Sequence, residues 1–282
     1  MTVERKVKEI IYGHDGRDGA GVNLKRVFSR ATVEDLDPFL LLDAFDSTDP
    51  NDYIKGFPWH PHRGIETVTY LLEGKIEHGD SLGNSGTIDE GCCQWMSAGS
   101  GIIHQEMPQA SERMLGVQLW VNLPAEKKMS HPAYRDIRKP DVVLARDDDV
   151  AQVRVIAGSY GGKKGPVGDI AVAPGFLDIL LYPGKEFAVE TEHEDTVFAF
   201  IIDGEGIFEG ELHSKRTGLL YEDGDQITFS AGSQEARVLV FSGKKLKEPV
   251  AWGGPIVMNT QEELERAFKE LDQGTFIKHK NF

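Results

Sequence analysis

The chain has 282 residues, 40% of them hydrophobic and 27% charged, which is the balance of a soluble globular protein with room for two ordinary domains. No apolar run approaches the ~18 residues of a membrane-spanning helix, and the N-terminus lacks the apolar core of a secretory signal, so we expect a cytoplasmic location and no membrane partner. The formal net charge of −15 would repel a phosphate backbone, which argues against direct nucleic-acid binding.

Short apolar runs separated by glycine and proline predict many short strands and an all-β barrel or sandwich. An internal repeat refines this expectation. The stretch YLLEGKIEH at residues 70–78 is echoed by FIIDGEGIF at 200–208, and DEGCCQWMSAGS at 89–100 is echoed by EDGDQITFSAGS at 222–233. We therefore expect two similar β domains in tandem, at residues 1–135 and 136–282.

One short helix is predicted near the C-terminus, within the second domain. Thr260 can cap it, with Glu263 three residues later completing a capping box, and Gly274 ends it. The apolar residues that share one face of this helix are Leu264, Ala267, Phe268 and Leu271.

Two pairs of potential metal ligands stand out in the first half of the chain. His60 and His62 precede the strand pattern ETVTYLLEG, and His104 and Glu106 lie 42 residues further on, again two residues apart. Residues two apart in a strand share a face, so two facing strands would bring all four side chains to one point. Three imidazoles and one carboxylate are ligands for a divalent first-row transition metal, and such a set accommodates iron, manganese, nickel, cobalt, copper or zinc.

Glu66 competes with Glu106 for the carboxylate position. An extended strand rises ~3.3 Å per residue, so Glu66 would lie ~13 Å beyond His62 unless a bulge folded it back. Glu106 needs no such bulge, and we assign it as the fourth ligand. Aromatic residues bracket the expected site and suit a flat aromatic ligand, although large aromatics in a barrel more often form core; they are Phe57, Trp59 and Trp95.

The motifs that hold these residues are long and specific. HPHRGIETVTYLLEG and QWMSAGSGIIHQEMP together resemble the pirin family of the cupin superfamily, and the resemblance covers nearly the whole chain. It implies two tandem cupin (jelly-roll) barrels, with one metal, usually iron, held in the N-terminal barrel by His60, His62, His104 and Glu106. It also implies quercetin 2,3-dioxygenase activity, with a flavonol-like substrate, dioxygen, and Glu106 as general base.

The second half of the repeat lacks the ligands. Aligning the SAGS motifs places Arg237 opposite His104 and Leu239 opposite Glu106, while the EG/DG echo places Glu190 and Glu192 opposite the first histidine pair. We expect a packing role for that domain. The alternative function, also implied by the resemblance, is a metal- and redox-responsive regulatory protein that binds a protein partner, as a transcription co-regulator does. A sugar isomerase is a weaker alternative, since the surroundings are aromatic rather than basic.

Overall fold

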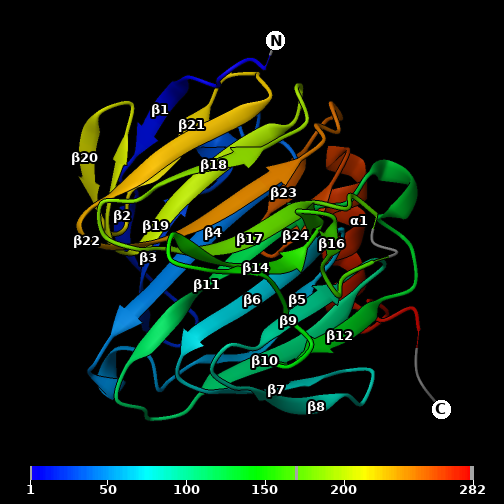
Figure 1. Ribbon diagram of the computed structural model, residues 1–282. Coiled ribbons are helices and arrows are strands. Elements are labelled where there is room, and N and C mark those ends of the chain that lie inside the picture. Colours follow the sequence, from blue (N-terminus) through cyan, green and yellow to red (C-terminus); the bar gives the residue numbers. More distant parts are fainter. Residues whose placement is uncertain (1, 169–170, 280–282) are drawn as a thin grey trace. The chain divides into compact units, whose positions relative to one another are not determined.

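The computed structural model describes residues 2–168 and 171–279, and strands dominate its regular structure (Figure 1). This confirms the all-β class. None of the helices in these two ranges is long and apolar enough to span a bilayer. The chain forms two compact units. The first unit comprises Asp15–Arg26, Phe39–Lys139 and Leu246–Phe282, and the second comprises Met1–His14, Val27–Pro38 and Pro140–Lys245.

The first unit contains two antiparallel sheets and a separate hairpin. Its seven-stranded sheet has the order β12-β9-β6-β11-β4-β3-β2, and its four-stranded sheet has the order β5-β10-β7-β8. The seven strands are β2 (His14–Asp18), β3 (Val22–Phe28), β4 (Phe39–Ser47), β6 (Ile65–Glu73), β9 (Cys93–Ser97), β11 (Met114–Asn122) and β12 (Ala133–Ile137). The four strands are β5 (Phe57–His62), β7 (Ile76–Asp80), β8 (Ser85–Ile88) and β10 (Ile102–Pro108).

Strand β10 shows why these residues form half-buried strands. Every second residue from Ile102 to Pro108 is buried and the residues between them are partly exposed, which is the period of two that a sheet with one inner face requires. His104 and Glu106 fall on the buried face. A polar row is therefore built into the inner face of this unit.

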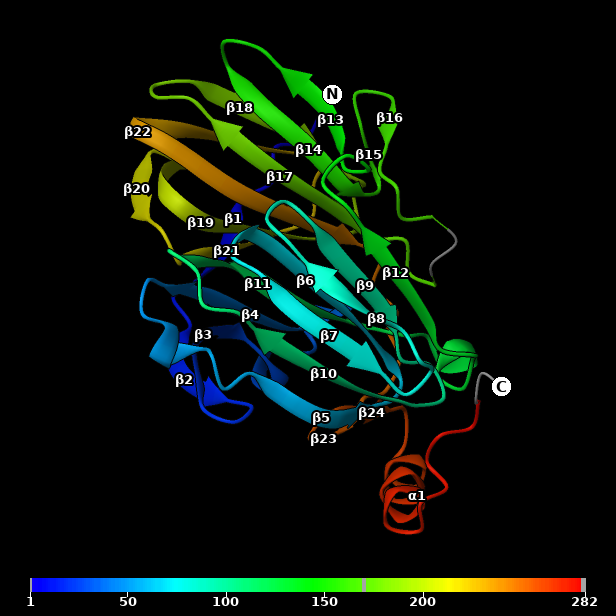
Figure 2. The same cartoon turned by 90° about the horizontal axis from the view of Figure 1, so that it is seen from below.

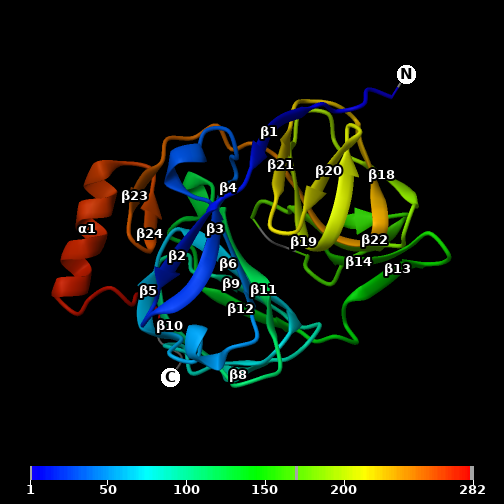
Figure 3. The ribbon, with the colours of Figure 1, turned by 90° about the vertical axis from the view of Figure 1, so that its left-hand side faces the viewer.

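The C-terminal segment adds the hairpin β23 (Ala251–Gly253) and β24 (Ile256–Met258) and the helix α1 (Gln261–Asp272), which lie side by side in Figures 2 and 3. The predicted capping box is confirmed, because the Thr260 hydroxyl accepts from the Glu263 amide and the Glu263 carboxylate accepts from the Thr260 amide. The helix ends two residues before Gly274, as predicted. Its apolar face packs in a cluster that contains Ile256, Met258, Leu264, Ala267 and Phe276.

The second unit is built on a nine-stranded antiparallel sheet with an apolar core. Seven strands follow the order β1-β21-β19-β22-β17-β14-β13, with β18 paired to β22 and β20 paired to β19. The strands are β1 (Val7–Ile11), β13 (Val143–Asp147), β14 (Ala151–Ala157), β17 (Gly175–Leu181), β18 (Glu186–Glu190), β19 (Thr196–Phe208), β20 (Glu211–Ser214), β21 (Gly218–Tyr221) and β22 (Gln226–Gly243). Residues 2–168 and 171–279 also contain a small hairpin, β15 (Ser159–Tyr160) with β16 (Lys163–Lys164), and the 3-10 turns Arg30–Thr32, Pro50–Asp52 and Ala125–Lys127.

The two units divide the chain differently from the expected boundary at residues 135/136. The N-terminal segment Met1–His14 belongs to the second unit, where β1 pairs with β21. The segment Leu246–Phe282, with the helix, belongs to the first unit, where the Val257 amide donates to the Arg63 carbonyl. The pairing of β1 with β21 and the packing of the apolar face of α1 in the first unit both involve partners that the sequence pattern does not identify.

Candidate metal centre

Two neighbouring antiparallel strands, β5 and β10, carry the three histidines. The register places His104 opposite His60 and Ile102 opposite His62, and a bulge follows between His104 and Glu106. Because residues two apart share a strand face, both His60 and His62 can point toward His104. The facing arrangement expected from the spacing is therefore present for the histidines.

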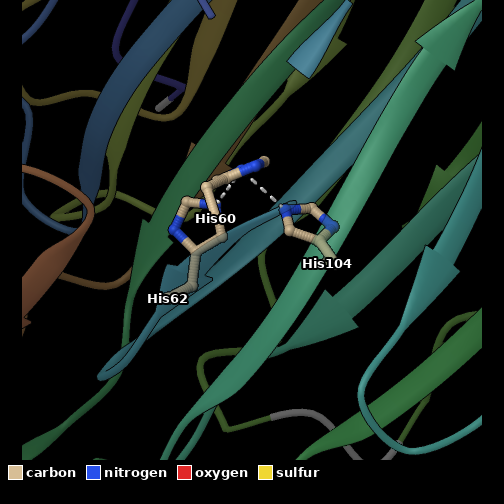
Figure 4. A group of neighbouring side chains, drawn as sticks. All are labelled: His60, His62 and His104. Carbon is tan, nitrogen blue, oxygen red and sulfur yellow. Dashed lines mark hydrogen bonds between the residues drawn. The ribbon is translucent and has the colours of Figure 1, made fainter. Parts of the chain in front are cut away.

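The three imidazoles converge through their Nε2 atoms (Figure 4). His60 Nε2 lies 3.0 Å from His62 Nε2 and 2.9 Å from His104 Nε2, and the candidate ligand atoms of all three lie within 4.8 Å of one another. Two nitrogens bound at about 2.1 Å to one ion, at a right angle, would be ~3 Å apart. The two separations that involve His60 Nε2 fit shared coordination.

Hydrogen bonds at the far side of two rings fix which nitrogen is free. His60 Nδ1 lies 2.9 Å from the Pro58 carbonyl oxygen, and His62 Nδ1 lies 3.1 Å from the Pro255 carbonyl oxygen. A carbonyl only accepts, so each Nδ1 carries the proton and each Nε2 presents a lone pair. Two lone pairs 3.0 Å apart repel unless a cation lies between them. An Nδ1–H bonded to a backbone carbonyl, with Nε2 left as the ligand atom, is a common arrangement of metal-binding histidines.

Burial keeps His62 and His104 neutral. His62 and His104 are 1% and 2% exposed. Burial, reinforced by the neighbouring His60, lowers the pKa of His62 to about 3, and burial together with the other two imidazoles holds the pKa of His104 well below its usual value. Neutral imidazole is the form that binds metal, so protons do not compete for these nitrogens near neutral pH.

Glu106 lies on the same buried face of β10 as His104 but does not belong to the three-histidine group. One carboxylate oxygen accepts a hydrogen bond from Thr69 Oγ1 at 2.8 Å, and the other accepts from Gln118 Nε2 at 2.7 Å. The structure thus brings together three of the four expected ligands and holds the fourth side chain through Thr69 and Gln118.

Glu66 and Trp95 face away from this group. Strand β9 pairs with β6 so that Gln94 is opposite Thr69 and Trp95 is opposite Val68, and successive residues alternate between faces. Trp95 is 2% exposed and its indole N–H donates to Glu66 at 3.0 Å. Burial raises the pKa of Glu66. The position of Trp95 corrects the expectation that it lines a ligand site: it is a core residue.

The other aromatic residues differ in their distance from the histidines. The Phe57 ring lies 6.4 Å from the His60 ring, and Trp59 is 55% exposed on β5. Sequence reasoning missed two further tryptophans. The Trp120 ring is 5.1 Å from the His62 ring, and the Trp252 ring is 6.0 Å from the Trp120 ring. The alternation of Gln118 and Trp120 in QLWVN was a usable signal for the first, whereas no local pattern indicates the second.

A second polar cluster in the first unit was also missed. His78 on β7 is 6% exposed, and its ring nitrogens contact the Tyr134 hydroxyl, which donates to Asp136 and accepts from Gln94 Nε2. Burial is the main cause that raises the pKa of Tyr134, the neighbouring Asp136 adds to it, and the hydroxyl stays protonated. His78 is thus a hydrogen-bonded interior histidine on the strand that pairs with β10.

The described residues of the second unit contain no counterpart of the histidine group. Arg237 Nη2 pairs with Asp178 at 2.6 Å and Leu239 is fully buried. Glu190 ends β18, and His193 is hydrogen-bonded to Asp225. Across residues 2–168 and 171–279, the group of His60, His62 and His104 is the one set of three or more such side chains spaced for a metal.

Comparisons with known proteins agree with the fold. The sequence model of the Pirin family matches residues 21–121, and that of the pirin C-terminal cupin domain matches residues 176–277. A protein of Pseudomonas aeruginosa named a putative quercetin 2,3-dioxygenase is 43% identical, covering 97% of this chain and 99% of its own. The crystal structure of a quercetin 2,3-dioxygenase from Acinetobacter baumannii superposes with a TM-score of 0.88 at 31% identity, covering 97% of this chain and 98% of that chain.

A further structural neighbour contains a metal. A bacterial pirin from Escherichia coli, solved in complex with nickel(II), has a TM-score of 0.62 at 25% identity and covers 86% of this chain and 98% of that chain. Matches to both family models and a 43% identical relative over nearly the full length leave no doubt about kinship. This chain belongs to the pirin family and is built from two cupin-type domains.

Proposed function

We propose that this protein is a metal-dependent dioxygenase of the cytoplasm that cleaves a flavonol such as quercetin with dioxygen. The observation that carries the proposal is the convergence of three imidazole nitrogens, with His60 Nε2 3.0 Å from His62 Nε2 and 2.9 Å from His104 Nε2. The names of two similar proteins, a putative and a crystallised quercetin 2,3-dioxygenase, support the choice of reaction.

The donor set favours one divalent transition metal, and we propose Fe²⁺ held by His60, His62, His104 and Glu106. Three imidazoles and a carboxylate suit a first-row ion better than thiolate or all-oxygen sites would. Nickel in the Escherichia coli pirin supports the ion class without deciding the element. Manganese, cobalt, copper and zinc remain competing occupants of the same donors.

The bound metal would supply a Lewis acid for the deprotonated flavonol hydroxyl and the redox chemistry that dioxygen requires. Glu106 would take the hydroxyl proton as general base. Thr69 and Gln118 each donate to one of its two oxygens, so the carboxylate is held in one orientation and each oxygen keeps a further lone pair for that proton. Phe57, Trp59 and the neighbouring Trp120 offer faces for a flat aromatic substrate.

The test is a pair of histidine variants compared with the wild-type chain. His104→Ala is expected to lose bound metal and flavonol consumption together, while His193→Ala, at an exposed histidine of the second unit, is expected to keep both. Metal content is measured on fresh protein, and consumption of quercetin with release of carbon monoxide is followed under air and under nitrogen.

The possible results distinguish the dioxygenase from the regulatory protein, the two functions that the family resemblance implies. Full metal content in His104→Ala would refute the ligand assignment. Wild-type protein that is loaded with metal but consumes no flavonol under air would refute the dioxygenase and favour the regulatory alternative, whose signature is capture of a protein partner that depends on the oxidation state of the metal.

A further inference from the structure

The two histidines of β5 are oriented by acceptors from very different places. His60 Nδ1 donates to the carbonyl of Pro58, two residues away in its own strand. His62 Nδ1 donates to the carbonyl of Pro255, which is 193 residues away in the C-terminal segment. The free lone pair of His62 Nε2 therefore depends on a part of the chain that supplies none of the expected ligands.

The turn that presents the Pro255 carbonyl is held by Trp252. Strands β23 and β24 pair with Gly253 opposite Ile256, so Gly254 and Pro255 form the tip of the hairpin. The Trp252 indole N–H donates to the Gly254 carbonyl at 2.8 Å. Its ring also lies 6.0 Å from the Trp120 ring, which meets the His62 ring edge to face. Trp252 thus fixes the hairpin tip next to His62.

A second anchor acts on the residue that follows His62. The Arg63 guanidinium is buried, donates to the carbonyls of Ser100 and Phe276 at 2.7 and 2.9 Å, and pairs with Glu270 at 2.7 Å. It also lies 4.2 Å from the centre of the Phe276 ring. Ser100 precedes β10, the strand that carries His104. The Arg63 side chain therefore links α1 to the segment that follows His62 and to the segment that precedes His104.

A third anchor surrounds Gly64. Lys128 Nζ donates to the carbonyls of Gly64 and Val257 at 2.8 and 2.9 Å and to the Asn122 side chain at 2.6 Å. Gly64 has φ +77°, and a Cβ placed there would come within 1.9 Å of the Val257 oxygen. The hairpin therefore lies directly against the backbone beside His62, with no room for a side chain between them.

We infer that the C-terminal segment, residues 246–279, belongs to the metal centre. Through the Pro255 carbonyl, held by Trp252, and through the Arg63–Glu270 pair, it positions His62 and controls how tightly the metal is retained. Trp252 and Glu270 act through His62 and are positioning residues. Groups that orient a metal-binding histidine commonly change metal affinity by about 10- to 100-fold.

The inference rests on the metal binding that the proposed function requires but not on the dioxygenase reaction. Co²⁺ alone serves as the probe, because its visible absorption reports the ligand geometry and its release into excess chelator can be timed. Trp252→Phe keeps an aromatic ring and removes the indole N–H. Glu270→Gln keeps the size of the side chain and removes the charge that faces Arg63.

Two controls separate positioning from loss of stability. Glu262→Gln changes a carboxylate on the same helix that pairs with Arg266 and is 84% exposed. Ile88→Val removes one methyl group from a different apolar cluster of the first unit. We expect both controls to release Co²⁺ at the wild-type rate and to show the wild-type spectrum. This should hold for Ile88→Val although that substitution lowers the unfolding temperature.

For Trp252→Phe and Glu270→Gln we expect release at least about 10-fold faster and a shifted Co²⁺ spectrum. Wild-type release rates and spectra in both variants would overturn the inference, as would equally fast release from Ile88→Val. If one variant does not fold, the other decides. Wild-type protein that binds no Co²⁺ would refute the metal site itself and with it the proposed function.

Discussion

Gly64→Ala tests how closely the C-terminal hairpin approaches the backbone next to His62. The new Cβ would lie 1.9 Å from the Val257 oxygen, against a minimum near 3.0 Å for real Cβ contacts, so Val257 must move by more than about 1 Å. That oxygen accepts from Lys128 Nζ, and the amide of the same residue donates to Arg63. Both hydrogen bonds would be lost or stretched.

The expected loss of stability follows from these contacts. A hydrogen bond to a charged amine contributes about 1.5–3 kcal/mol and an ordinary backbone bond about 1 kcal/mol. Alanine at φ +77° adds about 1 kcal/mol of backbone strain. Gly64→Ala is therefore expected to destabilise the first unit by ~4 kcal/mol. Gly83→Ala is the matched control, because Gly83 has φ +90° with no atom within 4 Å, and it should cost only about 1 kcal/mol.

The assay is urea unfolding followed by tryptophan fluorescence at pH 6, where Lys128, with a pKa of about 7, is charged. All four tryptophans belong to the first unit, so the signal reports its unfolding separately from that of the second unit. If Gly64→Ala is no less stable than Gly83→Ala, the backbone has room to yield and the argument for a fixed, close approach of the hairpin is refuted.

Three further substitutions test other parts of the first unit. Glu106→Gln should reduce flavonol turnover per bound metal by at least ~100-fold, because the general base is removed. Glu66→Gln should stabilise the protein at pH 7. Burial raises the pKa of Glu66 in the folded state, so its carboxyl favours folding while protonated and loses that contribution as pH rises. The difference in stability between the variant and wild type should vanish below the unfolded pKa of ~4.3. Burial lowers the pKa of Lys128 in the folded state to about 7, against ~10.4 in the unfolded state, so between about pH 7 and pH 10 the unfolded state binds one more proton. The free energy of unfolding should therefore rise with pH by up to about 1.4 kcal/mol per pH unit in this range. Lys128→Met should remove this slope.

Each result has a contrary outcome. Undiminished turnover in Glu106→Gln would exclude that carboxylate as the base. A Glu66→Gln variant equally or less stable than wild type at pH 7, in urea unfolding, would mean that the buried carboxylate is already compensated as an anion. Parallel stability profiles of wild type and Lys128→Met from pH 7 to 10 would show that the amine keeps its proton in the fold.

The histidine pairs could be predicted from sequence because the geometry that brings them together is local. Two residues of one strand always share a face, so the spacing of His60 and His62 already determined that they point the same way. The orientation of Glu106 could not be predicted in the same manner. Glu106 shares the buried face of β10 with His104, but β5 has an extra residue between the partners of these two, and the hydrogen-bond donors of Glu106, Thr69 and Gln118, come from two other strands.

Residues that depend on distant partners were the ones misjudged or missed. Trp95 lies in the same sequence motif as His104, but its face of β9 follows from pairing with β6, which composition does not reveal. Trp252 and Pro255 were invisible because no pattern in the chain links them to His62, 193 residues away in the case of Pro255. The terminal segments likewise join their units through distant partners, β21 for β1 and Arg63 for Val257.

The division of the first unit along the chain also affects the order in which the protein is made. Residues 140–245 are synthesised between the strands that carry the histidines and the hairpin that orients one of them. At ~5–20 residues per second, the ribosome exposes His60, His62 and His104 for several seconds or more before Pro255 exists. If the proposed centre binds a metal, an ion captured during that interval would meet a His62 imidazole free to use either nitrogen, and the orientation set by Pro255 would come only after the hairpin emerges and docks.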